Sequence, residues 1–148
     1  MKVVLQRVSQ ASCTIDHQLK SQIGPGYCLL VGFGPKDTGA LIEKMAAKIA
    51  KLRLFSDDNG KMNKSILDIH GEILSISQFT LYADWKKGNR PGFSNAAAPD
   101  IASQLYDQFN QTLNKLVPVQ TGLFGADMKI ALVNDGPVTL ELEMEEEV

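Results

Sequence analysis

The stretch LVNDGPVTLELEM, residues 132–144, decides how the chain is expected to complete its sheet. Apolar and polar residues alternate after its Gly-Pro pair, which is typical of a strand with one buried face. Pro137 has no N–H to donate to a sheet ladder, and Gly136 gives the backbone unusual freedom. The sequence therefore predicts strands at 128–133 and 138–144 around this pair. From the residues alone, the pair either makes a turn or presents backbone carbonyls to a ligand.

Upstream of this stretch, the pattern predicts further strands separated by turns. The nearly continuous apolar run YCLLVGF is typical of a buried central strand. The run EILSISQFTLYA predicts a strong strand, with polar side chains that enter in its C-terminal half, where a strand would reach a site. Asp16-His17 is a turn signal, and so is Gly24-Pro25-Gly26, which follows the expected strand at 18–23. The expected strands cover residues 3–8, 11–15, 18–23, 27–33 and 72–83.

Two segments have the periodicity of amphipathic helices. The first is capped by Asp37 or Thr38, and the second begins near Pro99-Asp100, where a proline is favoured. Their expected buried stripes are Leu41, Ile42, Met45, Ala46, Ile49 and Leu52, and then Ile101, Leu105, Phe109, Leu113 and Leu116. Two helices and about six strands without regular βα alternation favour an α+β domain. We expect a mixed or antiparallel sheet with helices on one side, in a single domain over residues 1–148.

The composition limits the class of protein. The 148 residues carry a net charge of −2 and are 44% hydrophobic, which is enough apolar material for one core. No run approaches the roughly 18–20 apolar residues of a membrane helix, and Gln and Arg interrupt the start too early for a signal peptide. We therefore expect a cytoplasmic protein without membrane association. The net charge disfavours a protein that coats nucleic acid by bulk electrostatics, but it allows a local basic patch.

Few residues could supply metal or acid–base chemistry. His17, His70 and the two cysteines lack the spacing of metal ligands, so neither a metal nor another cofactor is expected. A serine hydrolase would need Ser77 beside a histidine. His70 and Asp68 are near Ser77 in sequence, but an extended strand keeps them apart, which leaves only His17. If the protein is an enzyme, we expect backbone groups and the substrate itself to supply the chemistry.

The stretch SQFTL, residues 77–81, ends the strong strand and has two interpretations. It is either the end of a core strand, with Phe79 and Leu81 packed inside, or a strand end that aims backbone N–H groups outward. Such donors can stabilise an oxyanion.

The loop WKKGNRPGF, residues 85–93, mixes cations with aromatic residues. Such a loop is either simply solvated or able to hold phosphates and stack on bases. The stretch GKMNK adds two further lysines. The candidate cations for nucleic acid are Lys61, Lys64, Lys86, Lys87 and Arg90.

Two motifs together resemble a known family. SQFTL at 77–81 and NDGPVT at 134–139 look like the signature motifs of the D-aminoacyl-tRNA deacylases. Flanking matches occur in the same order over nearly the whole chain: QRV at 6–8, FSDDNGKMN at 55–63, RPGFS at 90–94 and TGLFGADM at 121–128. Gly92 departs from the pattern, because many relatives carry serine there. The intact SQFTL is similar to the D-specific branch of the family.

The resemblance implies an activity and an assembly. Such enzymes hydrolyse the ester of D-aminoacyl-tRNA, and also remove glycine mischarged on tRNA(Ala), as homodimers with a barrel-like sheet and two main helices. The partner would be the acceptor end of aminoacyl-tRNA. A cis Gly136-Pro137 of one subunit would enter the other subunit's site and reject L-amino acids. The implied site residues are Ser77, Gln78, Phe79 and Thr80, with Arg7 holding the Gly-Pro motif and Met128 near an adenosine pocket.

The chemistry within that resemblance leaves two routes open. In one, the free 2′-OH of the terminal adenosine activates water while N–H groups near Phe79 and Thr80 stabilise the oxyanion. In the other, Thr80 is a covalent nucleophile, although no base for it is visible. We favour the first route. Two rival functions also remain: a small hydrolase that uses Ser77 on another ester, and a non-catalytic dimeric module in which the Gly-Pro pair is merely a turn.

Overall fold

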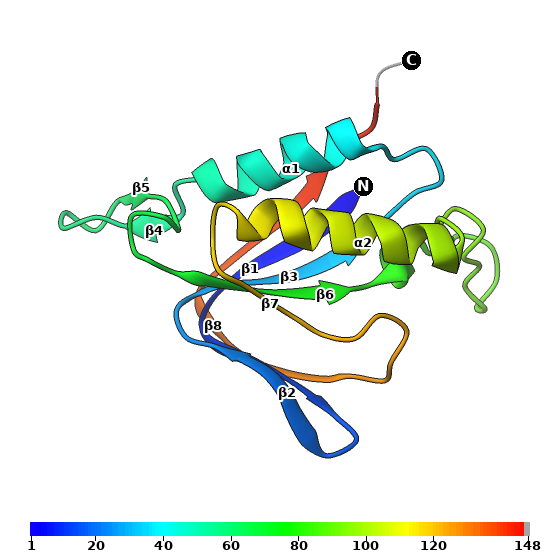
Figure 1. The fold of residues 1–148 in the computed structure, drawn as a ribbon, viewed down its shortest axis with the longest axis horizontal. Coiled ribbons are helices and arrows are strands. Elements are labelled where there is room, and N and C mark those ends of the chain that lie inside the picture. The colour runs from blue at the N-terminus through cyan, green and yellow to red at the C-terminus, as the bar shows by residue number, and fades with distance from the viewer. Residues whose placement is uncertain (147–148) are drawn as a thin grey trace.

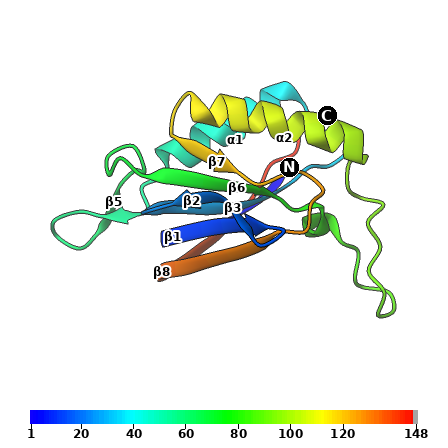
Figure 2. The ribbon, with the colours of Figure 1, turned by 60° about the horizontal axis from the view of Figure 1, so that its bottom comes forward.

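The computed structural model describes residues 1–146 and has two layers, a curved mixed sheet and a pair of helices that cover one of its faces (Figures 1 and 2). The predicted domain, 1–148, extends two residues beyond the described part. The elements are β1 (Lys2–Ile15), β2 (Gln18–Ile23), β3 (Gly26–Gly32), α1 (Gly39–Lys51), β4 (Phe55–Ser56), β5 (Met62–Lys64), β6 (Glu72–Ser77), the 3₁₀ helix η1 (Phe79–Tyr82), α2 (Pro99–Asn114), β7 (Val119–Thr121) and β8 (Lys129–Glu143).

The sheet topology confirms the predicted α+β class. The order is β2-β1-β3-β6-β7, with β8 on the other side of β1. β1 pairs antiparallel with β2, β3 and β8, whereas β3, β6 and β7 run parallel to one another. Parallel neighbours need crossover connections, and α1 and α2 lie in these crossovers. Both crossovers return on the same face of the sheet, so both helices lie there (Figure 2).

The outer strands differ from the prediction. The stretches at 3–8 and 11–15 form one strand, β1, and β7 was not expected. The two strands expected around the Gly-Pro pair are one strand, β8. Its pairing with β1 shifts register between Gln6 and Val8 and again between Val8 and Gln10. Pro137 cannot donate a hydrogen bond to the ladder, and the register shifts leave it unpaired. Pairing with β1 continues on both sides, so the strand does not end there.

The strand predicted over 72–83 ends early. β6 stops at Ser77, and the chain turns into η1. The Gln78 N–H donates to Val31 O at 2.7 Å, and Gly32 makes room for the turn. A Cβ on Gly32 would lie 2.9 Å from Gln78 O. The alternation that predicted the strand is correct up to Ser77 and fails beyond it, because the backbone leaves the sheet there.

The first helix is as predicted, whereas the second is only partly so: Phe109 and Leu113 of its expected stripe are buried, but the rest of the buried face differs. Thr38 caps α1, with its hydroxyl 3.3 Å from Leu41 N. In α2, Ile101 is 48% exposed and Leu116 is 44% exposed, whereas Tyr106 and Asn110 are buried. The Tyr106 hydroxyl donates to Ser75 O at 2.6 Å, so a polar contact with β6 helps decide which face of α2 packs on the sheet.

The sheet curls on the face away from the helices, which gives the barrel-like shape that was expected. The Ser21 hydroxyl of β2 donates to Thr121 O of β7 across the opening. A second apolar cluster fills the curl and includes Cys13, Cys28 and Ile76. Both cysteines are buried free thiols, and burial, followed by the neighbouring Cys13, raises the pKa of Cys28 to about 11.

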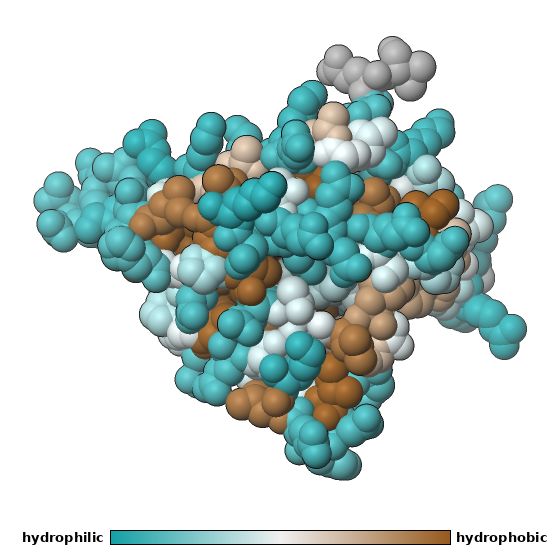
Figure 3. Space-filling view, viewed as in Figure 1, coloured by the Kyte–Doolittle hydropathy of each residue, from teal (hydrophilic) through white to brown (hydrophobic). Residues whose placement is uncertain are grey.

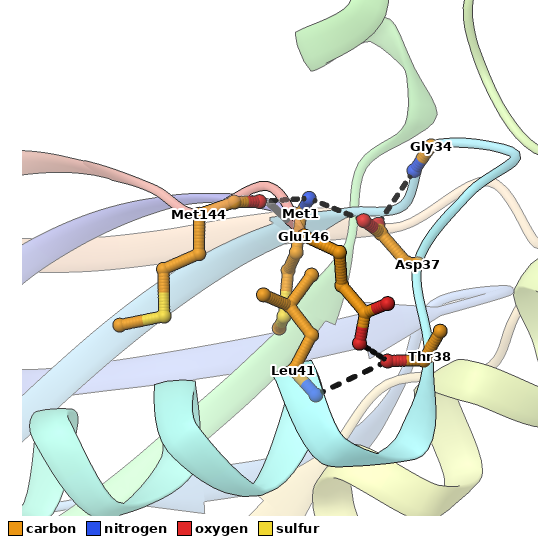
Figure 4. Close-up of polar contacts among 7 residues, drawn as sticks. All are labelled: Met1, Gly34, Asp37, Thr38, Leu41, Met144 and Glu146. Carbon is orange, nitrogen blue, oxygen red and sulfur yellow. Dashed lines mark hydrogen bonds and ion pairs between the residues drawn. The ribbon is translucent and has the colours of Figure 1, made fainter. Parts of the chain in front are cut away.

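The loop between β3 and α1 is tied to the N-terminus of the chain, at the start of β1. Figure 4 shows the Asp37 carboxylate between the Met1 amino group, at 2.8 Å, and Gly34 N, at 2.7 Å. Figure 3 shows a mainly hydrophilic surface around the helices, with apolar residues in separate patches. None of the helices within residues 1–146 is long and apolar enough to cross a membrane.

Candidate active site

A cavity of about 540 Å³ opens where β6 ends. Its walls come from the ends of β3 and β6, from η1, from the loop before α2, and from the segment between β7 and β8. The lining residues are Val31, Gly32, Phe33, Ile76, Ser77, Gln78, Phe79, Phe93, Ala96, Ala97, Pro99, Ala102, Phe124, Gly125, Ala126, Asp127, Met128 and Ile130. The site is therefore a mainly apolar pocket with a few polar groups, the usual form of a small-molecule site.

The pocket brings together most of the residues predicted from SQFTL. Ser77, Gln78 and Phe79 line it, and so does Met128. Phe79 is 55% exposed, so the interpretation that it is packed inside a core strand is wrong. Its ring instead meets Phe93 edge-on, with 5.0 Å between the centroids. The early end of β6 is what turns Phe79 out of the core and into the pocket wall.

Thr80 is exposed and follows directly on the pocket wall. Its hydroxyl accepts a hydrogen bond from the side-chain amide of Gln78. An amide N–H donates and cannot remove a proton, so this contact does not supply Thr80 with a base. Phe79 and Thr80 are also the first residues of η1. The N–H groups at the start of a helix have no acceptor within it, which leaves two backbone donors beside the pocket.

The residues of a serine hydrolase are not brought together. His17 and His70 are both exposed, and neither lines the pocket of the described chain. His70 precedes β6 and Ser77 ends it, a separation of about 20 Å along an extended strand. The Asp68 carboxylate accepts from Ser65 N at 2.8 Å, and this backbone bond lowers the pKa of Asp68. Ser77 therefore has no histidine beside it.

The segment between β7 and β8 supplies a pocket wall that the sequence did not reveal. Phe124 and Asp127 line the pocket together with Met128. Asp127 was not among the candidate acids or bases predicted from the sequence. Its carboxylate is exposed and lies 2.9 Å from Lys129 Nζ. Gly122 allows this wall to close, because a Cβ there would overlap with the sulfur of Met128. The TGLFGADM motif was visible in the sequence, but its position beside SQFTL was not.

The Gly136-Pro137 motif lies apart from this pocket. The peptide bond is cis, as the resemblance implied, and both residues are exposed. Arg7 is 9% exposed and holds the motif: its Nε donates to Asp135 O at 2.9 Å and its Nη1 to Leu54 O at 2.6 Å. A Cβ on Gly136 would lie 3.0 Å from Arg7 Nη2. This backbone is closely fitted to the guanidinium that supports it.

Strand register places the motif far from the pocket of its own chain. The irregular stretch 135–138 falls opposite Arg7, between the pairs Gln6–Thr139 and Val8–Asn134. Arg7 pairs with Tyr27, and Tyr27 pairs with Ile73. The path from the motif to Ser77 crosses from β8 to β1, from β1 to β3 and from β3 to β6, and then runs four residues along β6. At the usual spacings of a sheet, this puts the motif about 20 Å from Ser77. The two halves of the predicted site therefore do not meet within one copy of the chain.

The candidate cations form two separate groups. Lys86, Lys87 and Arg90 are exposed on the loop that leads to Phe93 and the pocket. Lys61 and Lys64 belong to the β4–β5 hairpin at the other end of the molecule (Figure 1), where Lys64 Nζ lies 3.9 Å from Asp58 Oδ1. This hairpin follows Leu54, whose carbonyl binds Arg7, so these lysines lie on the side of the Gly-Pro motif.

Within residues 1–146, no group of three or more His, Cys, Asp or Glu side chains lies together as metal ligands would. The expectation that the protein needs no metal or cofactor stays a prediction.

Comparison with known proteins identifies the class. The family model for D-Tyr-tRNA(Tyr) deacylase matches residues 4–143. A solved protein called "c-Myc DNA Unwinding Element Binding Protein" is 43% identical, with a TM-score of 0.93 over 99% of this chain and 100% of the other. Another, described as "a probable eukaryotic D-amino acid tRNA deacylase", is 17% identical, with a TM-score of 0.84 over 97% and 98% of the two chains. At that identity the likeness shows the fold alone.

The fold and the family match define a tRNA deacylase, which is a hydrolase. More specifically, the chain belongs to the D-Tyr-tRNA(Tyr) deacylase family. The family resemblance drawn from SQFTL and NDGPVT is thereby confirmed.

Proposed function

We propose that this protein hydrolyses the ester between a D-amino acid and the 3′-terminal adenosine of tRNA, accepts glycine mischarged on tRNA(Ala), and spares L-aminoacyl esters. The observation that carries the proposal is the pocket that joins Ser77, Gln78, Phe79 and Met128 at the end of β6. No histidine of the described chain accompanies these residues there, so the pocket suits a substrate that is already reactive.

The pocket suits a nucleoside at the reacting end of the substrate. Phe79, Phe93 and Phe124 offer aromatic surfaces on which a base can pack, and Met128 adds an adaptable apolar contact. Ser77 and Gln78 supply hydroxyl and amide groups at the end where the ester would lie. The amino acid itself needs few contacts, which suits an enzyme that accepts many D side chains.

The chemistry follows from the backbone donors and from the substrate. The N–H groups of Phe79 and Thr80, at the start of η1, stabilise the oxyanion that forms when water attacks the ester carbonyl. The free 2′-OH of the terminal ribose assists that water. Thr80 is not the nucleophile in this route, because its hydroxyl is bound to the Gln78 amide, which cannot act as a base. Trapping an acyl-enzyme that is lost in Thr80→Val would contradict this route.

Handedness is read by the main chain of Gly136-Pro137. Its carbonyls receive the α-ammonium group of the substrate. With that group and the ester fixed, the side chain of an L-residue would point into the motif, and that of a D-residue would point away. L-esters are thus excluded by a clash, a form of specificity that requires no contact with the D side chain. Glycine has no side chain to clash and is accepted.

The motif acts on a second copy of the chain, because the pocket of its own chain is about 20 Å away by strand register. A two-fold dimer would bring each motif to the other pocket and form two equal sites. The outer edge of β8 supports such an assembly, since this strand pairs only with β1 among residues 1–146. A second copy would cover that edge.

The same arrangement would gather the cations of the two subunits around the acceptor end of the tRNA. Lys86, Lys87 and Arg90 would come from the subunit that supplies the pocket, and Lys61 and Lys64 from the subunit that supplies the motif. Few phosphate contacts imply weak binding that falls with added salt. We expect the protein in the cytoplasm, where an enzyme that acts on aminoacyl-tRNA meets its substrate.

The experiment that tests the proposal compares initial rates of hydrolysis of D-Tyr-tRNA, L-Tyr-tRNA and glycyl-tRNA(Ala) by the purified protein. We expect the first and third to be cleaved and the second to be spared. Equal cleavage of the two tyrosyl esters would contradict the proposal. Ser77→Ala separates it from a serine hydrolase, because our route retains much of the activity without the hydroxyl and a serine hydrolase would lose it.

A second candidate function comes from the 43% identical protein, whose name refers to a DNA unwinding element. Binding of unwound, single-stranded DNA would use the same exposed cations. Competition separates the two functions: a single-stranded DNA that binds more tightly than tRNA, without any cleavage of D-Tyr-tRNA, would favour DNA binding.

A further inference from the structure

The loop from η1 to α2 exposes the single tryptophan of the chain. Trp85 is 70% exposed, a larger fraction than that of any other large apolar side chain named as exposed. Lys86, Lys87 and Arg90 follow it, and all three are exposed. An indole left in water beside three cations is costly for a fold and useful for a binding surface. Figure 2 shows this loop projecting from the body of the molecule.

The backbone around Trp85 is held in place at its base. Asp84 N donates to Gly92 O at 2.8 Å, and Gly92 N donates back to Asp84 O at 2.9 Å. The Asp84 carboxylate also accepts from Lys86 N at 3.3 Å. Trp85 thus directly follows a residue whose backbone is fixed by two hydrogen bonds. The less closely packed part of the loop lies further on, at Gly88, where nothing lies within 4 Å of an added Cβ. The Cα atom from which the ring projects is therefore held at a defined place.

This place is next to the mouth of the pocket. Phe93 follows Gly92 directly, lines the pocket and packs against Phe79. Because Trp85 and Phe93 flank the same bonded pair, their Cα atoms lie no more than about 13 Å apart. That distance spans the next one or two nucleotides of a strand whose last nucleoside fills the pocket.

The charge of the loop fits a phosphate backbone. Residues 84–92 carry three cations and one carboxylate, a net +2, on a chain whose net charge is −2. A base has a flat face that stacks on indole whatever its sequence, while nearby cations contact the phosphates. No other exposed large apolar side chain lies within these nine residues, which disfavours an apolar partner.

We propose that Trp85 stacks on an unpaired base of the single-stranded acceptor end, next to the esterified nucleotide, while Lys86, Lys87 and Arg90 contact its phosphates. The inference rests on the proposed function, because that function puts the terminal nucleoside in the pocket. Stacking and phosphate contacts do not read the 2′-OH, so single-stranded DNA of equal length also binds at Trp85. A blunt duplex, whose bases are already stacked, does not.

Trp85 itself reports the contact, because it is the only tryptophan. The wild-type protein is titrated with an RNA tetranucleotide ending in CCA, with the matching DNA and with a blunt RNA hairpin. We expect saturable quenching of the tryptophan emission by both single strands, weakened by salt, and none by the hairpin. Unchanged emission at concentrations where a labelled copy of the same RNA is bound, or quenching by the hairpin alone, overturns the proposal.

Kinetics on D-Tyr-tRNA form the second arm. Trp85→Ala should raise KM by about 5- to 100-fold with kcat unchanged, the range expected for loss of one stacking contact, and Trp85→Phe should recover most of it. Leu19→Ala, which alters an exposed apolar side chain of β2 outside the pocket lining, is the matched control. If Trp85→Ala has the KM of the wild-type protein, the proposed stacking contact is contradicted, while the proposed deacylase activity is not. If the wild-type protein does not cleave D-Tyr-tRNA, the proposed activity is contradicted, and the fluorescence titration still tests whether Trp85 stacks on a base.

Discussion

At the scale of single residues, Arg7 links the Gly-Pro motif to the body of the protein. Its buried guanidinium donates in two directions, to Asp135 O and to Leu54 O. A lysine ammonium cannot reproduce this planar fork. We expect Arg7→Lys to lower the free energy of unfolding by about 1–3 kcal/mol and to reduce the preference for D- over L-Tyr-tRNA. Urea denaturation and paired hydrolysis rates measure the two effects.

The matched control is Arg53→Lys. Arg53 is exposed, and its Nη1 lies 3.1 Å from Asn63 Oδ1. Surface substitutions of this kind change the free energy of unfolding by no more than about 0.5 kcal/mol. If Arg7→Lys and Arg53→Lys had the same small effect on stability and on chiral preference, Arg7 would not position the motif.

Asp127 is the residue that could overturn the substrate-assisted route. Among the described residues that line the pocket, it carries the only carboxylate. Its exposure and its contact with Lys129 make it a poor base. We expect Asp127→Asn to lower kcat less than tenfold, well below the roughly 10²–10⁴-fold that a general base contributes. Single-turnover hydrolysis of D-Tyr-tRNA measures this, with Lys129→Gln as the control. A loss of a thousandfold would make Asp127 the base.

The pocket residues that lie in motifs could be predicted from the sequence, and those that tertiary structure supplies could not. Ser77, Gln78 and Met128 belong to the motifs and share a pocket. Asp127 lies next to Met128 in sequence, yet neither its residue type nor its spacing indicated that it would face SQFTL. That neighbourhood depends on how β6 and the β7–β8 connection are arranged, which no local pattern encodes.

At the scale of elements, the turn after β6 depends on Gly32 in the neighbouring strand. A Cβ at that position would approach Gln78 O to 2.9 Å and Leu81 Cβ to 3.3 Å. Since Gln78 O is backbone, the turn at residues 78–82 must shift to admit it. We expect Gly32→Ala to fold and to lose kcat on D-Tyr-tRNA. Circular dichroism and hydrolysis rates test the two parts.

Gly92→Ala is the control for that substitution. Nothing lies within 4 Å of a Cβ there, and its backbone is not in the left-handed region. It should retain wild-type kcat. If Gly32→Ala were also fully active, the position of the turn would not matter for catalysis.

Elements with long, clean patterns were predicted well, and those decided by tertiary contacts were not. The stripe of α1 and the turn at Asp16-His17, where both φ angles are positive, follow from local sequence. The end of β6 does not, because alternation continues through Ser77 into η1. The buried face of α2 was predicted only in part, because Tyr106 is buried there and its hydroxyl donates to Ser75 O in the interior. β7 has three residues, too few for a pattern.

At the scale of the whole molecule, the three tyrosines make the free energy of unfolding fall as pH rises in the alkaline range. Burial raises the pKa of Tyr27, Tyr82 and Tyr106, and nearby carboxylates raise that of Tyr82 further. A raised pKa means that the folded state holds the phenolic proton more tightly than the unfolded state. The resulting stability is complete below the ordinary value of about 10 and is lost as pH rises through the folded pKa values.

We therefore expect the tyrosine absorbance of the folded protein to stay that of the phenol at pH 10 and to change together with unfolding at higher pH. Parallel spectrophotometric and circular-dichroism titrations test this. Ionisation of all three phenols near pH 10 without loss of structure would show that they are accessible to solvent.

The central claim is that the site is assembled from the pocket of one subunit and the Gly-Pro motif of another. It is tested most directly by mixing two variants. Ala126→Trp fills the pocket, and Gly136→Ala disturbs the motif, because its φ is +129° and the new Cβ would lie 3.0 Å from Arg7 Nη2. Each variant alone should fail to cleave D-Tyr-tRNA.

In a heterodimer purified through two different tags, one of the two sites has both an intact pocket and an intact motif. The measurement is its rate on D-Tyr-tRNA. We predict that the rate returns to about half that of the wild-type dimer, with L-Tyr-tRNA still spared. A heterodimer no more active than its two parents would contradict the claim that the subunits share the site.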